Sequence, residues 1–305
     1  MSFEVIGFEA DSLLNWDGLC EVFLEGHKLP KAEIDDTFLY RGKDTLLSRS
    51  AWIDGMGVAV KSATIYPDNP AKGSPMINGA VSLFSDSDGT LEALIDFHLV
   101  TKWKTAGDSL LGAKLLARPD SKKILIVGAG TVGRNLRSAY ASAFPDAEFM
   151  IWNRTAAGAE AFASEFENTA AFTDLQAAVS EADIVTSATM STEPLIMGDW
   201  LKPGQHIDLI GAYRPDMREV DDTALIRSRV FVDSRDTTLD HIGELKKPLS
   251  EGVISRDHVL ADLYDAKAGS FKRTSDDEIT LFKNGGGAHL DLMTSRYILK
   301  AWNAR

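Results

Sequence analysis

The 305-residue sequence contains one cysteine, Cys20. A single cysteine can form neither an intrachain disulfide nor a cysteine-based metal site, which is typical of a protein in a reducing compartment. Apolar runs of the roughly 20 residues needed to cross a bilayer are missing, and the N-terminus lacks the basic and apolar segments of a signal peptide. The sequence therefore predicts a cytoplasmic protein that does not interact with membranes.

Basic residues are also scarce, with 32 Lys and Arg against 45 Asp and Glu, for a net charge of −13. Because a nucleic-acid partner requires clustered cations, this balance argues against one. The six histidines are scattered without the spacing of a metal site, so no metal is expected. The composition, 44% hydrophobic and 25% charged, is that of a globular protein long enough for two domains.

The pattern of predicted elements changes near residue 120. Before it, short alternating strands such as "GVAVKSATIYPDN" mix with helices such as "FHLVTKWKTAGDSLLGAKLL". After it, apolar strands alternate with helices, which predicts parallel βαβ units. We therefore expect an α/β protein: a mixed α+β domain over residues 1–119 and a doubly wound Rossmann domain over residues 120–287.

The segment "ILIVGAGTVGRNL" places G-x-G-x-x-G between a buried strand and a helix. In that context the first glycine permits a tight turn, the second lets the backbone approach a pyrophosphate, and the third permits close packing of the helix. A ligand-free tight turn is the alternative. The predicted nucleotide-binding residues here are Gly128, Ala129, Gly130, Thr131, Val132 and Gly133.

The end of the next predicted strand, "IWNRT", selects the nucleotide. An Asp or Glu about 20 residues after the glycines would bind a ribose 2′-OH, but this sequence has Asn153, Arg154 and Thr155. Arg154 can pair with a 2′-phosphate, and the two neutral side chains can add hydrogen bonds. We expect NADP(H) to be preferred over NAD(H); the alternative is that Arg154 is an ordinary surface residue.

Several cations of the first domain lie in apolar surroundings. Lys61 interrupts an alternating strand, and a lysine on a buried strand face must be paired or functional. Arg41 lies in "LYRGKD" and Lys104 in the "VTKWKTAGDS" helix. Taken singly, each cation is more typical of a solvated surface, and spacing alone does not bring them together.

Six motifs resemble the ornithine cyclodeaminase/μ-crystallin family over most of the chain from about Arg41. They are "VKSATIYPDNP", "TKWKTAGDSLLGAKLLARPD", "ILIVGAGTVGRNL", "IWNRT", "HIDLIGAYRPDMREVDD" and "RTSDDEITLFKNGGGAHLDL". The resemblance implies a Rossmann domain and a discontinuous α+β domain that binds substrate and forms a homodimer. It also implies that the C-terminal helix, residues 288–305, returns to the first domain.

Residue by residue, the resemblance implies that Lys61 is the active-site lysine, which contacts the substrate carboxylate and relays a proton. Arg41 resembles the first carboxylate-binding arginine. Lys104 stands where the family usually has a second arginine, so the charge remains but the bidentate fork is lost. Tyr213, in "GAYRPD", stands where cyclodeaminases place an aspartate; we expect it to shape the substrate pocket.

A tyrosine, with an ordinary pKa of about 10, is a poor base for ornithine cyclisation. We therefore expect NADPH-dependent reduction of a cyclic imino acid, 1-pyrroline-2-carboxylate or 1-piperideine-2-carboxylate, to L-proline or L-pipecolate. Ornithine cyclodeamination and alanine dehydrogenation remain alternatives within the family. A crystallin-like nucleotide-binding protein without catalysis is the alternative from another class.

Overall fold

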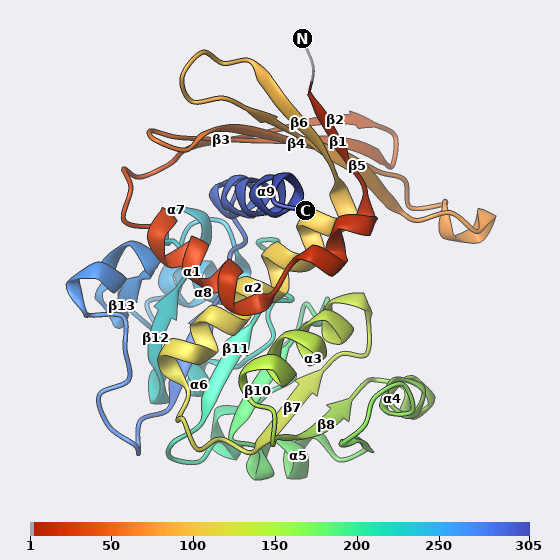
Figure 1. Cartoon of the computed structure of the whole chain (residues 1–305). Helices are drawn as coiled ribbons and strands as arrows, with labels where there is room; N and C mark the ends of the chain where they lie inside the picture. Colours follow the sequence, from red (N-terminus) through yellow and green to blue (C-terminus); the bar gives the residue numbers. More distant parts are fainter. Residues whose placement is uncertain (1–2) are drawn as a thin grey trace. The chain divides into compact units, whose positions relative to one another are not determined.

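The computed structural model describes residues 3–305, which form two compact units (Figure 1). One unit combines Met1–Lys104 with Gly287–Arg305, and the other comprises Thr105–Gly286. The two limits lie inside helix α2 (Phe97–Leu116) and just before helix α9 (Ala288–Asn303). The predicted ranges differ from these units mainly in residues 105–119, and the roles assigned to the two domains remain predictions.

The first unit is built on a six-stranded sheet in the order β1-β6-β5-β4-β3-β2. Its neighbouring strands are antiparallel except for the parallel pair β1–β6. Its elements are β1 (Glu4–Ile6), η1 (Phe8–Leu13), α1 (Trp16–Gly26), β2 (Glu33–Arg41), β3 (Asp44–Ile53), β4 (Gly57–Ile65), η2 (Pro70–Lys72), β5 (Ile77–Phe84), β6 (Leu91–Asp96), the start of α2, and α9.

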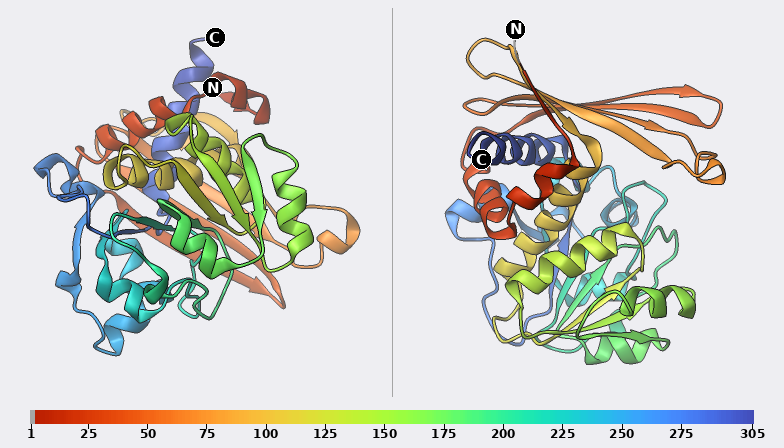
Figure 2. Two further views of the ribbon diagram at one scale, coloured as in Figure 1. Left: turned by 90° about the horizontal axis from the view of Figure 1, so that it is seen from below. Right: turned by 45° about the vertical axis from the view of Figure 1, so that its right-hand side comes forward.

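Helix α9 packs against β3, β4 and β5, as both views of Figure 2 show for the blue helix and the orange strands. Because side chains alternate along a strand, odd-numbered residues of β4 such as Ala59, Lys61 and Ala63 are buried on this face. The even-numbered residues of β4 lie on the other face. The sheet therefore has one face under α9 and one face that α9 does not cover.

The second unit is a parallel sheet of eight strands in the order β13-β12-β14-β11-β10-β7-β8-β9. Its elements are the rest of α2, β7 (Lys123–Val127), α3 (Thr131–Ala143), β8 (Glu148–Trp152), α4 (Ala156–Ala163), β9 (Thr169–Phe172), α5 (Leu175–Glu181), β10 (Ile184–Ser187), η3 (Gly198–Trp200), β11 (His206–Leu209), α6 (Asp222–Arg227), β12 (Arg229–Val232), α7 (Arg235–Thr238), α8 (Gly243–Ser250), η4 (Arg256–His258), β13 (Val259–Asp262), η5 (Leu263–Ala268) and β14 (Thr280–Lys283).

The central strands of this sheet are buried along their length, as expected when both faces of a parallel sheet are covered. From β7 the chain adds β8 and β9 on one side of the sheet and then returns to add β10 and β11 on the other side. The carboxyl ends of β7 and β10 are therefore a topological switch point. The predicted α/β class, with a doubly wound parallel sheet, is confirmed. Strands β9, β13 and β14 were not predicted.

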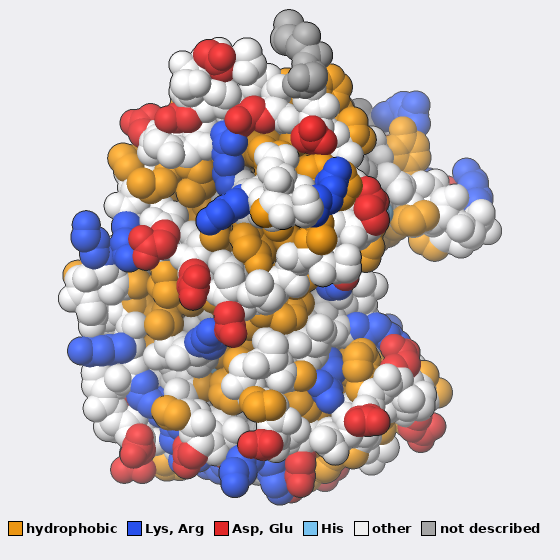
Figure 3. Space-filling model, viewed as in Figure 1, with side chains coloured by type: hydrophobic (Ala, Val, Ile, Leu, Met, Phe, Trp, Pro, Cys, Tyr) orange, Lys and Arg blue, Asp and Glu red, His pale blue; other side chains and the backbone are white. Residues whose placement is uncertain are grey.

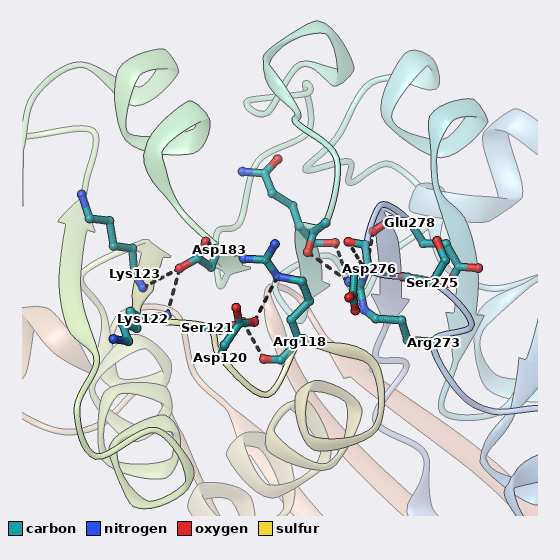
Figure 4. Close-up of polar contacts among 12 residues, drawn as sticks. Arg118, Asp120, Ser121, Lys122, Lys123, Asp183, Arg273, Ser275, Asp276 and Glu278 are labelled. Carbon is teal, nitrogen blue, oxygen red and sulfur yellow. Dashed lines mark hydrogen bonds and ion pairs between the residues drawn. The ribbon is translucent and has the colours of Figure 1, made fainter.

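Two arginines bind the amino-terminal edge of the same sheet (Figure 4). Arg118 donates to Asp183, just before β10, at 3.4 Å. Arg273 donates to backbone carbonyl groups of Leu116 at 2.7 Å and Gln205 at 3.1 Å. Asp183 and Gln205 directly precede β10 and β11, and Leu116 ends α2, so the two arginines tie the starts of these strands to the end of the helix.

Candidate functional site

The turn between β7 and α3 requires glycine at two positions. Gly128 has a φ of 114°, in the left-handed region, and a Cβ there would lie 2.9 Å from the Ala188 carbonyl oxygen. A Cβ on Gly133 would lie 2.2 Å from the Gly128 carbonyl oxygen. The chain can therefore turn sharply at the switch point and enter α3 in close contact with the end of β10.

A cavity of about 350 Å³ opens beside this turn in the second unit. It is lined by neutral or basic residues: Gly128, Ala129, Gly130, Trp152, Asn153, Arg154, Thr155, Ala188, Thr189, Met190, Ser191 and Leu195. Six of the predicted nucleotide-binding residues thus meet at one cavity. The other three, Thr131, Val132 and Gly133, lie in the first turn of α3.

The polar groups of this cavity fit a dinucleotide. Helix α3 has 13 residues and begins directly after Gly130, so its first backbone N–H groups and positive dipole end suit a pyrophosphate. The Ala129 N–H donates to Asn153 Oδ1 at 3.2 Å, which ties the glycine turn to the end of β8. Arg154, next in sequence, is exposed on the rim, where its guanidinium can reach a ribose phosphate.

The first unit holds a buried cluster of charges around Lys61, between β4, α2 and α9. Lys61 Nζ donates to Asp291 Oδ1 and to Thr101 Oγ1, both at 3.0 Å, and lies 4.6 Å from the centre of the Phe97 ring. An ammonium has three N–H donors, so a ligand can take the third. Asp291 Oδ2 accepts no hydrogen bond from any residue of 3–305.

Helix α2 contributes Lys104 to this cluster, because positions three apart lie on one face of a helix and Thr101 already faces Lys61. Lys104 is buried. Lys102, two residues away, points elsewhere and pairs with Asp11 at 2.7 Å. The helix thus separates a lysine that faces the cluster from one that serves a surface ion pair.

The arginine of this cluster is Arg49, which the sequence reasoning missed. Arg49 pairs with Lys61 in the register of β3 and β4, so the two side chains share the face covered by α9. Its guanidinium forms a fork with Asp36 of β2, with contacts of 3.0 and 2.7 Å. The turn "DGMG" could have identified Arg49 from the sequence. In a hairpin centred on Gly55, residue 49 of one strand pairs with residue 61 of the other.

The electrostatics of the cluster favour an anion. Three cations, Arg49, Lys61 and Lys104, lie close enough to act on one another and on the carboxylate of Asp291. Burial lowers the pKa of Lys61 to about 8; the Asp291 carboxylate opposes this shift, and the Lys104 and Arg49 cations add to it. Burial raises the pKa of Asp291, but the neighbouring cations outweigh it and hold that pKa below its usual value.

The structure does not bring Arg41 to this cluster. Arg41 is the last residue of β2, at an odd-numbered position, and strand alternation puts it on the face opposite Lys61. Its side chain is 77% exposed, pairs with Asp44 at 3.0 Å and donates to the Tyr66 hydroxyl at 3.2 Å. Arg49, and not Arg41, lies beside Lys61 on the face covered by α9.

Tyr213 belongs to the second unit, in the loop after β11, and is 57% exposed. The neighbouring Arg214 forms a fork with Asp216, with two contacts of 2.9 Å. The preceding residues Gly211 and Ala212 are bound by Glu219. Glu219 therefore fixes the start of the loop, while the side chain of Tyr213 remains exposed.

Two of the six histidines, His27 and His289, lie edge to face 5.3 Å apart in the first unit. Burial lowers the pKa of both, to about 4 for His27, so both are neutral at ordinary pH. Within residues 3–305 no three or more His, Cys, Asp or Glu side chains are grouped to hold a metal ion. No helix of this described part is long and apolar enough to cross a membrane.

Basic and acidic side chains are interspersed on the face drawn in Figure 3. Blue and red areas alternate there over hydrophobic and neutral surface, as expected for a chain whose acidic excess is spread out. The cluster around Lys61 thus brings three cations together in a protein with an acidic excess.

The model of the ornithine cyclodeaminase/mu-crystallin family matches residues 51–305. The chain belongs to this family. A Δ1-pyrroline-2-carboxylate reductase of Paracoccus denitrificans is 49% identical over 298 residues, which cover 96% of this chain and 94% of that protein. The family resemblance deduced from the six motifs is therefore confirmed.

Two solved structures are similar in fold to this protein over nearly the whole chain. The Thermococcus litoralis Δ1-pyrroline-2-carboxylate reductase in complex with NADH and L-proline has a TM-score of 0.90 and 26% identity, covering 99% of this chain and 98% of that one. An archaeal alanine dehydrogenase dimer with bound NAD has a TM-score of 0.90 and 27% identity, covering 100% and 97%.

Proposed function

We propose that this protein is a nicotinamide-dependent oxidoreductase that reduces a cyclic imino acid, 1-pyrroline-2-carboxylate or 1-piperideine-2-carboxylate, to L-proline or L-pipecolate. The observation that carries the proposal is the grouping of Lys61, Lys104 and Arg49 beside Asp291, in a chain that also has a dinucleotide cavity. The name of the Paracoccus relative and the L-proline bound to the Thermococcus protein support the same substrate class.

In this reaction Arg49 and Lys104 bind the substrate carboxylate, and Lys61 acts on the imine nitrogen. Asp36 orients the Arg49 guanidinium through its fork, which leaves Arg49 to contact an anion as a directed donor. Lys104 supplies a compact positive charge, and Arg41 is replaced in this role by Arg49.

Lys61 provides the proton. With a pKa of about 8, its ammonium is mostly charged at neutral pH and still acidic enough to donate to an imine nitrogen. A reduced nicotinamide, when bound, would supply a hydride to the imine carbon. The C=N double bond would become a C–N single bond as a C–H bond and an N–H bond form, with the proton from Lys61. Asp291 holds the ammonium in place and stabilises its charged form.

Tyr213 supports the reductase over ornithine cyclodeamination. Cyclisation of a diamine needs a base for the second amino group, and a neutral phenol is a poor one near pH 7. A cyclic imine already has its ring, so a tyrosine in this loop only needs to shape the pocket. Alanine dehydrogenation would use the same carboxylate-binding residues, so the experiment below also tests it.

The experiment mixes purified protein with NADPH or NADH and, in separate reactions, 1-pyrroline-2-carboxylate, 1-piperideine-2-carboxylate, or pyruvate with ammonia. We expect loss of NAD(P)H absorbance with at least one cyclic imine, at a rate well above that with pyruvate and ammonia. Absence of turnover with both cyclic imines would refute the proposal, and ammonia release from L-ornithine would replace it with cyclodeamination.

The preferred cofactor is proposed to be NADP(H), on the strength of Arg154 at the rim of the cavity. The two solved structures contain NADH and NAD, so the proposed preference for NADP(H) rests on residues of this chain alone. Arg154→Ala should weaken NADPH binding about 10-fold or more and leave NADH binding within about twofold. Arg256→Ala, an exposed arginine paired with Asp240, is the control; equal losses for both cofactors would contradict the preference.

A homodimer through the uncovered sheet face is proposed in addition. Leu39, Leu46 and Trp52 lie on the face opposite Lys61, and Leu39 and Trp52 are 67% and 56% exposed. Exposed apolar side chains on one face mark an interaction surface, and the archaeal relative is described as a dimer. In sedimentation analysis the wild type should be a dimer and Trp52→Glu a monomer. A monomeric wild type would refute the proposal.

A further inference from the structure

Glu219 is a fully buried carboxylate at the carboxyl edge of the parallel sheet. Its Oε1 accepts hydrogen bonds from Ser187 Oγ at 2.6 Å and from the N–H and Oγ1 of Thr189 at 2.8 and 2.9 Å. Its Oε2 accepts from the N–H groups of Gly211 at 2.7 Å and Ala212 at 3.0 Å. One side chain thus binds the loops that follow β10 and β11.

These two loops are also in direct contact through Gly211. A Cβ on Gly211 would lie 2.1 Å from the Thr189 carbonyl oxygen and 2.3 Å from its nitrogen. Only glycine permits this approach, and the five hydrogen bonds of Glu219 maintain it. The Thr189 loop and the loop that carries Tyr213 therefore have one fixed relation to each other.

A second layer of buried charges supports Glu219. Glu244 accepts from the N–H groups of Glu219 at 2.7 Å and Val220 at 3.1 Å. Lys283 donates to the carbonyl oxygens of Leu209 at 2.9 Å and Asn284 at 2.7 Å, and its charge lies near both glutamates. Every one of these contacts involves backbone, so the layer fixes the path of the chain around Glu219.

The two loops bound by Glu219 belong to the proposed site. Thr189 lines the dinucleotide cavity on the β10 side of the switch point, which is the side where the nicotinamide half of a dinucleotide lies in such folds. Ala212 directly precedes Tyr213. A residue that sets both loops would control the nicotinamide half, whereas Arg154, in the loop after β8, would serve the adenosine half.

We propose that Glu219 is a positioning residue for the reductase reaction: it aligns the loop of Thr189 with the loop of Tyr213 at the nicotinamide end of the cofactor. This inference rests on the proposed function. Glu219 acts through the two loops and does not itself contact substrate. Exchanging one of its oxygens for an amide NH₂ would set a donor against backbone N–H donors and separate the loops.

The test is Glu219→Gln, measured by kcat, KM and the binding of NADPH, NADH and ADP-ribose. Misplacement by about 1 Å can cost about 100-fold in rate, so we expect kcat to fall by about that factor. Binding of the preferred reduced cofactor should weaken, whereas binding of ADP-ribose, which lacks the nicotinamide, should stay within about twofold. Asp208→Asn is the matched control.

Asp208 is an equally buried carboxylate on β11, but it binds Thr186 at 2.6 Å and Tyr140 at 3.2 Å, away from both loops. Its variant should change thermal stability and leave kcat near that of the wild type. If Glu219→Gln has unchanged kcat per folded molecule, or loses ADP-ribose and NADPH binding equally, the positioning role is refuted.

If Glu219→Gln does not fold, Ser187→Ala tests the same role, because it removes one hydrogen bond to Glu219 Oε1 and keeps the carboxylate. It should lower kcat about fivefold, the scale of one net hydrogen bond, with ADP-ribose binding unchanged; unaltered kcat would refute the role. The binding comparison also separates this inference from the proposed function. A wild type that reduces no cyclic imine refutes the function, while the NADPH and ADP-ribose affinities still decide the role of Glu219.

Discussion

Each unit buries one lysine on a strand, Lys61 on β4 and Lys283 on β14, and the surroundings of the two differ in sign. The cluster around Lys61 contains further cations, Lys104 and Arg49. Lys283 lies among carboxylates, those of Glu219, Glu244, Asp233 and Asp208. Lys61 therefore has further cations as neighbours, and Lys283 has carboxylates as neighbours.

The partners of the two lysines differ as well. Lys61 is bound by side chains, Asp291 and Thr101, which can change protonation or orientation. Lys283 is bound by backbone carbonyls, and three of the carboxylates beside it, Glu219, Glu244 and Asp233, accept from backbone N–H groups. A buried charge that is satisfied by backbone fixes chain geometry, whereas one that is held by side chains beside other cations is suited to bind an anionic ligand.

The largest effect should come from replacing each lysine by methionine. Lys61→Met should lower turnover of the cyclic imine by about 10³-fold, because a general acid contributes about 10²–10⁴, with cofactor binding retained. Lys283→Met should instead reduce the unfolding free energy by about 3–5 kcal/mol, since it leaves buried carboxylates without their cation. Steady-state kinetics and urea unfolding give the two readouts.

The double variant Lys61→Met/Asp291→Asn is the control for folding. It removes both buried charges, so it should recover stability lost by Lys61→Met and remain inactive. Turnover above about a tenth of the wild-type rate in Lys61→Met would remove Lys61 from the mechanism and erase the contrast with Lys283.

A smaller effect should distinguish Arg49 from Arg41, two arginines of the first unit. Arg49→Lys keeps the charge and loses the planar fork that Asp36 orients, so KM for the imine should rise about 10-fold with a smaller change in kcat. Arg41→Lys lies on the other face of the sheet and should leave both constants within about twofold. If the KM change follows Arg41, the original assignment from the sequence stands and the cluster assignment is wrong.

The arginines show where sequence reasoning succeeds and where it stops. The glycine fingerprint is a local pattern, so strand, turn and helix could be predicted from "ILIVGAGTVGRNL". Lys61 was found because it interrupts an apolar alternation. Arg49 was missed because its role depends on hairpin register, which sets residues 12 apart side by side.

Longer-range pairings were beyond any local pattern. Asp291 approaches Lys61 only when α9 packs on the sheet, across a separation of 230 residues. Likewise, β14 enters the parallel sheet between β11 and β12 although it follows them in sequence. Buried glutamates such as Glu219 and Glu244 looked like surface residues, because charge is normally solvated, and only the fold shows the backbone groups that bind them.

Asp291→Asn should give a moderate effect that appears mainly in the pH profile. The proposed reaction needs protonated Lys61, so kcat/KM should fall as pH rises through about 8. The Asp291 carboxylate raises the pKa of Lys61, and removing it should lower that pKa and move the alkaline limb to lower pH. Profiles between pH 6 and 10 test this.

The control for that profile is Asp11→Asn, which breaks an ion pair with Lys102 outside the cluster. Its alkaline limb should coincide with that of the wild type. An unshifted limb in Asp291→Asn would show that Asp291 does not control the protonation of Lys61.

The smallest effect should appear in the second cluster as a pH dependence of stability. Burial, with the nearby Glu219, raises the pKa of Glu244 to about 7 from an ordinary 4.5. Between these values the folded protein retains a proton that the unfolded chain has lost, so the unfolding free energy should fall as pH rises from 4.5 to 7. Glu244→Gln should flatten this decline near pH 7 in urea unfolding. Because Asp208, with a pKa raised by burial to about 6, contributes in the same direction at lower pH, some slope should remain; a slope unchanged near pH 7 would mean that Glu244 is ionised throughout.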